Sequence, residues 1–295
     1  MASQLIVWQK KSKLACAVKV LSPAKLNLYL NITGRYSKNY HRIESIVERI
    51  SLRDEIVIKK TLGPAVTISC SRRDLAVPGN LCVKAAILMQ KKFSLKCGFD
   101  IILKKNIPVG DGLGGGSSNA ASTLIAINEM LKLRLSRPEL YKLGAQLGSD
   151  VNFFLSESPY ALMEGRGENI TPFSGKPLRH LVLWPGVHLS TKDVYANTHI
   201  KLTKLLSNVN ILKYALKKGD RKLMEVSNFN ILEKSALSLC NELKKVKRHF
   251  GRLGIDFRLT GSGSALYSFL SGDHLYHLIK KDLPGKWLLF SVRTF

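Results

Sequence analysis

The chain has few cysteines, and they lack the spacing of a disulfide framework or a zinc site. Only five occur in 295 residues, the number is odd, and no two of them form a C-x-x-C pair. Disulfide-rich secreted domains and zinc ribbons both depend on paired cysteines. Both classes are therefore excluded, and a reducing compartment is expected.

Long apolar runs are also lacking. No segment approaches the roughly 20 consecutive apolar residues that a membrane-spanning helix requires, so a soluble protein without a membrane partner is expected. Residues 1–13 contain lysines but no long apolar core of a secretory signal. We expect a cytoplasmic protein of bacterial type, or an organellar stromal one if the first residues are a presequence.

Acidic residues are scarce relative to basic ones. The chain has 46 lysines and arginines against 21 aspartates and glutamates, a formal charge of +25. Such an excess favours polyanionic partners, including nucleotides and nucleic acids. The lysines are spread along the whole chain, so a generally basic surface explains them equally well and charge alone assigns no function.

Several familiar phosphate-binding motifs are missing as well. The chain has no G-x-x-x-x-G-K-[ST], and the H-R-D and D-F-G motifs of protein kinases are absent. A G-x-G-x-x-G does occur, at Gly110, Gly112 and Gly115, but a dinucleotide site needs an acidic residue at the end of a second strand about 20 residues later. Glu129 falls instead within a helical pattern, which disfavours that interpretation.

A glycine-rich loop from Pro108 to Ser118 carries the strongest chemical signal. It lies between a period-two stretch, Phe99 to Leu103, and a period-3.6 stretch that we expect to form a helix from Ser117. Glycines let the backbone approach a ligand, and a helix start offers free N–H groups to an anion. The loop is therefore predicted to bind phosphate; a packing turn is the alternative.

Further elements are predicted from local patterns. A helix is expected from Pro138 to Gly148, followed by a polar turn at Asp150 and a buried strand over residues 151–155. Lys25 and Asn27 lie two positions apart in a strand-like run, hence on one face. A second small-residue loop, Leu259 to Ala265, follows a strand-like stretch near the C-terminus.

These segments together resemble the GHMP kinase superfamily. Within it, the runs P-A-K-L-N-L, N-Y-H, G-L-G-G-G-S-S-N-A-A, G-S-D-V and G-R-G-E resemble the 4-diphosphocytidyl-2-C-methyl-D-erythritol kinase family. The resemblance implies ATP-dependent phosphorylation of the 2-hydroxyl of the methylerythritol conjugate, in non-mevalonate isoprenoid biosynthesis. It also implies an α+β, two-domain fold with the active site in the interdomain cleft, and we place the domains at residues 1–165 and 166–295.

The resemblance implies a role for each matching residue. Asp150 and Lys25 match the catalytic aspartate and lysine, and Asn27 a substrate-contacting asparagine. Tyr40 and His41 match a pair that recognises cytosine, while Thr191 and Tyr195 fall where the family supplies a threonine and a second aromatic side chain. The residues expected to bind ATP are Asn80, Pro108, Gly110, Gly112, Leu113, Gly114, Gly115, Gly116, Ser117 and Ser118.

The kinase resemblance implies that the metal is Mg²⁺ carried with ATP. The histidines themselves form no ligand set, since His274 and His277 lack a third partner nearby in sequence. Ser118, at the helix start, is within reach of such an ion by its loop position alone. Asp111 departs from the family pattern, which generally has alanine, glycine or serine at this loop position. A carboxylate beside phosphates is repulsive unless it points outward or meets Mg²⁺.

Two other functions stay open at this point. A GHMP kinase for mevalonate, homoserine or a sugar explains the phosphate loop but leaves Tyr40, His41 and Asn27 without a ligand. A basic nucleic-acid-binding relative without catalysis explains the charge, although nucleic acid is not the expected partner. Monomer and homodimer are both compatible with the sequence.

Overall fold

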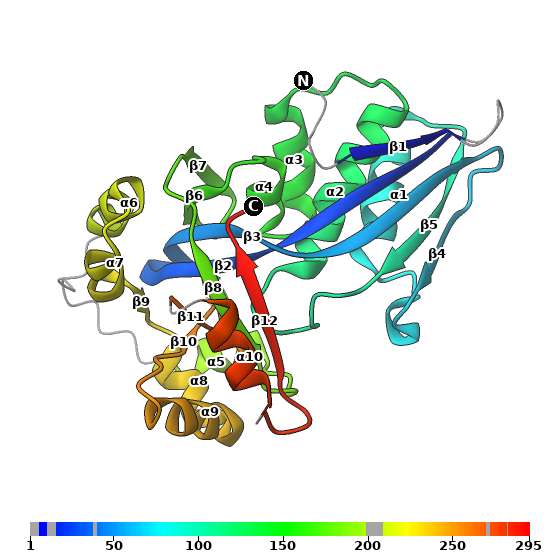
Figure 1. Ribbon diagram of the computed structural model, residues 1–295. Helices are drawn as coiled ribbons and strands as arrows, with labels where there is room; N and C mark the ends of the chain where they lie inside the picture. The colour runs from blue at the N-terminus through cyan, green and yellow to red at the C-terminus, as the bar shows by residue number, and fades with distance from the viewer. Residues whose placement is uncertain (1–5, 11–15, 38–39, 199–208, 270–271, 282) are drawn as a thin grey trace. The chain divides into compact units, whose positions relative to one another are not determined.

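The computed structural model describes residues 6–10, 16–37, 40–198, 209–269, 272–281 and 283–295 (Figure 1). Its contacts divide the chain into two compact units. Unit 1 comprises residues 1–24, 53–107 and 114–157, and unit 2 comprises residues 25–52, 108–113 and 158–295. The predicted domain division at residue 165 stays a prediction. The two compact units are interleaved along the sequence, because two 22-residue strands, β2 (Cys16–Ser37) and β3 (Tyr40–Thr61), contribute to both.

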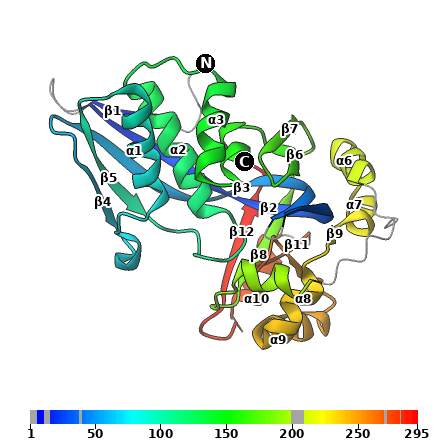
Figure 2. The ribbon, with the colours of Figure 1, turned by 180° about the vertical axis from the view of Figure 1, so that it is seen from behind.

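Unit 1 is a sheet covered by helices. Its strands are β1 (Ile6–Lys10), the first part of β2, the last part of β3, β5 (Gly98–Lys104) and β4 (Val66–Cys70), in the order β1-β2-β3-β5-β4. The helices are η1 (Arg73–Leu75), α1 (Leu81–Phe93), α2 (Gly115–Met130), α3 (Arg137–Leu147) and α4 (Val151–Leu155). Figures 1 and 2 show α1 and α2 lying side by side over one face of this sheet.

Strand β5 confirms the period-two prediction. Phe99, Ile101 and Leu103 are buried, while Ile102 and Lys104 between and after them are exposed. Alternating side chains point to opposite faces of a strand, so the three apolar residues face the helices. A single-sided apolar face of this kind requires the helical cover that α1 and α2 provide.

Helix α3 begins and ends as its sequence predicts. Glu139 accepts hydrogen bonds from the Ser136 backbone N–H at 2.8 Å and from its hydroxyl at 2.6 Å, and the same bonds hold the pKa of Glu139 below its ordinary value. Gly148 ends the helix in an extended conformation. A local polar contact thus sets the start of the helix, and the helix ends at the glycine that the sequence indicates.

Two predicted elements differ from the structure. Residues 151–155 form the helix α4 rather than a strand, since a short apolar run carries no period of its own and here packs against α2 and α3. Helix α2 begins at Gly115 rather than Ser117, and its cap is Gly114 in the left-handed conformation, with φ of 72°. The serines therefore lie inside the first turns.

Unit 2 contains a second, four-stranded antiparallel sheet. Its order is β10-β11-β8-β12, from β10 (Arg258–Leu259), β11 (Leu266–Ser268), β8 (Arg179–Trp184) and β12 (Leu288–Arg293). In the same unit β3 pairs with β6 (Tyr160–Gly165), β6 with β7 (Asn169–Phe173), and β2 with β9 (Phe229–Asn230). The helices are α5 (Thr191–Ala196), α6 (Val209–Lys218), α7 (Arg221–Ser227), α8 (Glu233–Leu239), α9 (Asn241–Gly251) and α10 (Asp273–Lys281).

The described helices include none that is both long and apolar enough to cross a membrane.

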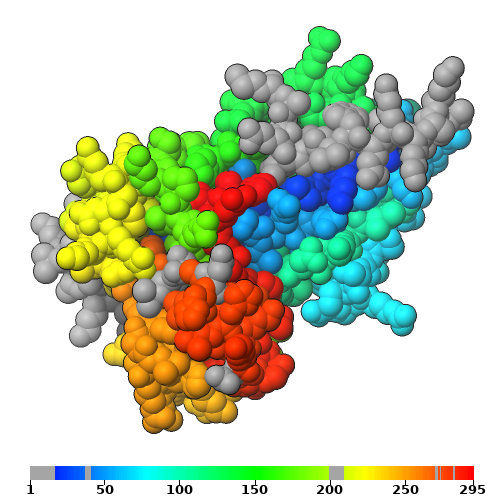
Figure 3. Space-filling model, viewed as in Figure 1, coloured from blue at the N-terminus to red at the C-terminus, as the bar shows by residue number. Residues whose placement is uncertain are grey.

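A buried polar cluster fixes the chain end within unit 2. Glu48, on β3, accepts a hydrogen bond from Thr294 and lies 2.7 Å from His180 Nε2, and both Glu48 and His180 are fully buried. The backbone N–H of Phe295 donates to the Arg49 carbonyl at 2.9 Å. Figure 3 shows the chain end, in red, beside the green segment that contains β6 and β7.

The cluster predicts a stability effect. Glu48→Gln keeps the side-chain volume but removes the charge that His180 and Thr294 contact, so one buried donor loses its acceptor. We expect the free energy of unfolding to fall by about 1–3 kcal/mol, measured by urea unfolding. Glu225→Gln is the matched control: its pair with Arg221 is about half exposed, and its loss should cost less than about 0.5 kcal/mol. Equal effects of the two substitutions would contradict this view of the cluster.

Candidate active site

In unit 2, three segments distant in sequence meet through their backbones. Gly112 has a φ of +81°, and a Cβ placed on it would lie 2.3 Å from the Thr260 carbonyl oxygen. The Ala265 N–H donates to the Asp111 carbonyl at 3.0 Å, and the Lys25 N–H donates to the Leu113 carbonyl at 2.9 Å. The glycine-rich loop, the second small-residue loop and strand β2 are thereby brought to one place.

Asp111 serves the loop's own backbone. Its side chain is buried, and its Oδ1 accepts a hydrogen bond from the Leu113 N–H at 2.9 Å. Aspartate side chains that bond the N–H two residues later stabilise turns. The carboxylate at position 111, which departs from the family pattern, thus bonds the backbone of its own loop.

His188 also contacts the loop, and the sequence analysis did not find it. Its Nδ1 lies 2.9 Å from the Gly110 carbonyl oxygen, and a Cβ placed on Gly110 would come within 2.0 Å of the same nitrogen. The flanking sequence, Pro185-Gly186-Val187-His188, has the composition of an ordinary turn, so no local signal indicates this contact. Gly110 has a φ of +71°, which L side chains rarely adopt, so a side chain here would be strained even if the exposed His188 ring moved aside.

Lys25 and Asn27 lie on one face of β2, as predicted. Both side chains are buried, and the Lys25 ammonium donates to Asn27 Oδ1. Asn27 Nδ2 donates to Ser45 Oγ at 2.8 Å, and the Asn27 N–H donates to Thr260 Oγ1 at 2.9 Å. A buried ammonium is costly unless it is bonded, and the bond to Asn27 meets that need.

The predicted substrate residues form a second cluster in unit 2. The rings of His41 and Tyr195 stack, with centroids 5.2 Å apart and planes 29° from parallel. Burial and the nearby Arg35 charge hold the pKa of His41 below its ordinary value, which favours the neutral ring at pH 7. Thr191 Oγ1 lies 2.8 Å from Ser262 Oγ on the second small-residue loop. The side chain of Tyr40 lies outside what the structure describes.

In unit 1, the start of α2 offers backbone donors. The first N–H groups of a helix have no intrahelical acceptor, and the cap residue Gly114 has no side chain to occupy them. Gly115, Gly116 and Ser117 therefore present N–H groups at the positive end of a 16-residue helix. This arrangement suits an anion such as a phosphate.

Two other predicted segments lie beside this helix start. A Cβ placed on Gly148 would lie 3.6 Å from Ser117 Oγ, which brings the turn before Asp150 close to α2. Asp150 is half-buried and occupies the N-cap position of α4, at the junction of elements that the sequence predicts. A Cβ placed on Gly116 would lie 3.4 Å from Leu81 at the start of α1. Unit 1 thus gathers residues 80–81, 115–118 and 148–150.

Asn80 and Ser118 have structural contacts of their own. Asn80 caps α1: its Oδ1 accepts from the Cys82 N–H and its Nδ2 donates to the Leu75 carbonyl, both at 2.9 Å. Ser118 is fully buried, and its Oγ accepts from Ser22 Oγ at 2.9 Å. Burial raises the pKa of the nearby Cys82 thiol to about 12, so this cysteine is no nucleophile. The roles of Asn80 and Ser118 toward ATP stay predictions.

Among the described residues, no group of three or more His, Cys, Asp or Glu side chains could hold a metal ion. Mg²⁺ in kinases is usually bound through one or two carboxylates together with substrate phosphates and water. The half-buried Asp150 beside the helix start is compatible with a magnesium that arrives with the nucleotide.

Comparisons with known proteins agree on one family. The pattern of the GHMP kinases N terminal domain matches residues 80–158. The chain is 33% identical over 274 residues to 4-diphosphocytidyl-2-C-methyl-D-erythritol kinase of Clostridioides difficile. The aligned region covers 92% of each of the two chains. The enzyme of the same name from Geobacter sp. is 34% identical, over 94% of this chain and 99% of its own.

Solved structures give the same result for the fold. A crystal structure of 4-(cytidine 5'-diphospho)-2C-methyl-D-erythritol kinase superposes with a TM-score of 0.79 at 29% identity, over 93% of this chain and 98% of the other. Homoserine kinase from Cytophaga hutchinsonii reaches 0.71 at 17% identity, over 97% and 96% of the two chains, which indicates the fold alone. The α+β GHMP kinase fold is confirmed, and the location of the active site in an interdomain cleft stays a prediction.

The relatives at 33 to 34% identity over more than nine tenths of the chain also confirm the resemblance seen in the sequence. The chain is an ATP-dependent small-molecule kinase and belongs to the 4-diphosphocytidyl-2-C-methyl-D-erythritol kinase family.

Proposed function

We propose that this kinase transfers the γ-phosphoryl group of ATP to the 2-hydroxyl of 4-diphosphocytidyl-2-C-methyl-D-erythritol, in non-mevalonate isoprenoid biosynthesis. Its relatives of that name cover nearly the whole chain. The observation that carries most weight is local. Lys25, Asn27, the glycine-rich loop and the second small-residue loop are held together by backbone bonds within unit 2.

Asp150 is proposed as the general base. In the transfer, the acceptor oxygen attacks the γ-phosphorus, the bond from that phosphorus to the β,γ-bridging oxygen breaks, and ADP leaves with the bond's electron pair. Asp150 would take the hydroxyl proton. Positioned general bases typically accelerate such steps about 10²- to 10⁴-fold.

Lys25 and the helix start are proposed to stabilise charge. The Lys25 ammonium is buried and fixed by Asn27, so it is a preorganised cation of the kind that stabilises a transferring phosphoryl group. The N–H groups of Gly115 to Ser117 would hold phosphate oxygens, together with the loop residues before them. Mg²⁺, bound with ATP mainly through phosphate oxygens and water, would neutralise part of the phosphate charge.

His41 and Tyr195 are proposed to recognise the cytosine base, with Tyr40 as a second stacking partner and with Asn27 and Thr191 at the rest of the substrate. The stacked rings of His41 and Tyr195 support this role. Rings at stacking distance already have the spacing of an aromatic platform, and base–aromatic contacts are typically worth about 1–3 kcal/mol. Asn80 is proposed to lie near the adenine of ATP.

We further propose that the enzyme acts in the bacterial cytoplasm, or in an organellar stroma if its first residues are a presequence. A monomer or homodimer is the proposed working form. The bacterial sources of the relatives support the first of these locations.

The substrate is tested by ADP release across a panel of alcohols. The conjugate should be phosphorylated with a kcat/KM at least 100-fold above that for mevalonate, homoserine and galactose, because only the conjugate carries a cytosine for His41 and Tyr195. A preference for any of the other alcohols would assign a different GHMP kinase activity. Salt-sensitive RNA binding without any turnover would instead support the non-catalytic alternative.

Substitution of the proposed base tests the mechanism. Asp150→Asn should lower kcat about 10²- to 10⁴-fold with a KM for ATP within threefold of wild type, as measured in the same assay. Asn has the size of Asp, and the Asp150 side chain makes no cap hydrogen bond to α4 that could be lost, so the fold should survive. Asp220→Asn, at the cap of α7, is the matched control and should retain full turnover. An Asp150→Asn enzyme with more than a tenth of wild-type kcat would rule out this base.

Truncation of the aromatic platform tests recognition of the base. Tyr195→Ala should raise the KM for the conjugate about 5- to 150-fold, which corresponds to the loss of about 1–3 kcal/mol, while the KM for ATP stays unchanged. Tyr214→Ala removes an exposed tyrosine on α6 and should change neither constant. An equal rise in both KM values for Tyr195→Ala would argue against a role in base recognition.

A further inference from the structure

Asp54 and Lys105 are charged residues in rows that are otherwise apolar. Ile56 and Ile58 on β3 are buried. Asp54 lies two residues before Ile56, so the alternation of a strand puts it on the same face. Counting forward from Ile101 and Leu103 on β5 places Lys105 on the same buried face. Glu55 pairs with Lys104, so the antiparallel register brings Asp54 opposite Lys105.

The two side chains form an ion pair inside unit 1. The Lys105 ammonium donates to Asp54 Oδ2, and the side chains are 5% and 0% exposed. Burying two charges is expensive even when they are paired, and apolar residues of similar volume often serve stability as well or better. A buried pair at the end of two apolar rows therefore calls for an explanation other than stability.

Asp54 also bonds the two residues that lead into the glycine-rich loop. Its Oδ1 accepts from the Asn106 N–H at 2.7 Å and from the Ile107 N–H at 2.9 Å. The Asn106 side chain donates to the Arg53 carbonyl at 2.9 Å. The chain is thus bonded to β3 immediately before Pro108.

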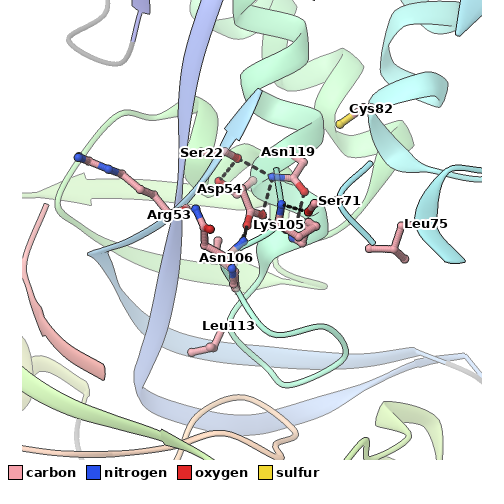
Figure 4. A network of polar contacts seen from close by, with 12 residues as sticks. Ser22, Arg53, Asp54, Ser71, Leu75, Cys82, Lys105, Asn106, Leu113 and Asn119 are labelled. Carbon is pink, nitrogen blue, oxygen red and sulfur yellow. Dashed lines mark hydrogen bonds and ion pairs between the residues drawn. The ribbon is translucent and has the colours of Figure 1, made fainter. Parts of the chain in front are cut away.

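The same carboxylate reaches the helix that follows the loop. Asn119 Nδ2 donates to Asp54 Oδ2 and to Ser22 Oγ, each at 2.9 Å (Figure 4). Ser22 Oγ donates in turn to Ser118 Oγ. Lys105 Nζ lies 3.2 Å from Asn119 Oδ1, and a Cβ placed on Gly115 would lie 3.1 Å from Nζ. One buried carboxylate therefore connects residues 106–107 with the first turns of α2.

We propose that Asp54 is a positioning residue for the phosphate-binding loop. It fixes the first turns of α2 relative to residues 106 and 107, so that the N–H groups of Gly115, Gly116 and Ser117 point where ATP phosphates bind. This inference rests on the proposed function of the loop. Asp54 acts through the backbone and through Asn119, and we assign it no contact with the nucleotide.

The direction in which Asp54→Asn changes ATP affinity separates a role through position from a role through charge. The pair is neutral as a whole, so it adds little net attraction for phosphate. If charge alone mattered, Asp54→Asn would leave the Lys105 cation uncompensated beneath the helix start and would strengthen ATP binding. If position matters, the same substitution puts an amide N–H₂ or a weaker acceptor against Lys105 and Asn119, displaces the helix start, and weakens ATP binding.

The test measures the affinity of a non-hydrolysable ATP analogue by calorimetry and both KM values for Asp54→Asn. We expect the dissociation constant and the KM for ATP to rise at least tenfold, with the KM for the conjugate within twofold of wild type. Glu48→Gln, another fully buried carboxylate, is the matched control for lost stability and should leave ATP affinity within twofold. Unchanged or tighter ATP binding by Asp54→Asn, or equal weakening by Glu48→Gln, would overturn the proposal.

Two further variants keep the test decisive if Asp54→Asn does not fold. Ser22→Ala leaves the ion pair intact but removes the hydroxyl that links Asn119 to Ser118. It should raise the KM for ATP three- to tenfold, and no change would count against the proposal.

Asp54→Asn combined with Asn119→Asp restores one carboxylate and one amide beside Lys105. This double variant should recover thermal stability without recovering wild-type ATP affinity, since the negative charge then lies in the helix. Full recovery of affinity would contradict a specific role for position 54.

A wild-type enzyme that fails to phosphorylate the conjugate would refute the proposed function, whereas the analogue's dissociation constants would still decide the role of Asp54.

Discussion

The close approach of Gly112 to the Thr260 carbonyl oxygen is the contact on which the arrangement of unit 2 depends. No side chain fits between the two segments, because a Cβ at position 112 would lie 2.3 Å from that oxygen. The glycine also has a φ that L side chains rarely adopt. Sterics and backbone conformation therefore both demand glycine here. Beside the contact, the bond from the Ala265 N–H to the Asp111 carbonyl joins the same two loops.

The second small-residue loop, which contains Thr260, also contacts the other predicted site residues of unit 2. Thr260 accepts the backbone N–H of Asn27, Asn27 accepts the Lys25 ammonium, and Ser262 lies beside Thr191. A strongly basic chain has many lysines on its surface, yet Lys25 is buried and bonded. In the proposed mechanism, one buried and fixed cation, Lys25, therefore matters more than the net charge of +25.

Local sequence patterns predicted the elements that local forces decide. The alternation of Phe99, Ile101 and Leu103 predicted β5, and Pro138 with Gly148 predicted the limits of α3, because helix-end signals and alternation act within a few residues. The run 151–155 was wrongly predicted as a strand, since its helical form depends on packing against α2 and α3. The start of α2 was predicted two residues late, at Ser117, because the glycines before it gave no sign of a helix and the cap is itself a glycine, Gly114.

Contacts between distant segments could not be predicted in the same way. Asp54 and Lys105 are 51 positions apart, and only the period-two rows that contain them, taken with the strand register, could have revealed the pair. His188 gave no signal because a histidine after a turn is ordinary. The resemblance to GHMP kinases supplied what patterns could not, since it assigned Lys25 and Asp150 to one reaction although they are 125 positions apart in the sequence.

The affinity of Gly112→Ala for a non-hydrolysable ATP analogue tests the central contact most directly. Gly251→Ala, at a helix position with open space around it, provides the comparison, and thermal unfolding shows that both variants are folded. If the loop must lie against Thr260 to bind ATP, a folded Gly112→Ala protein binds the analogue at least tenfold more weakly than wild type, and Gly251→Ala binds it normally. A folded Gly112→Ala protein with wild-type affinity would contradict the account.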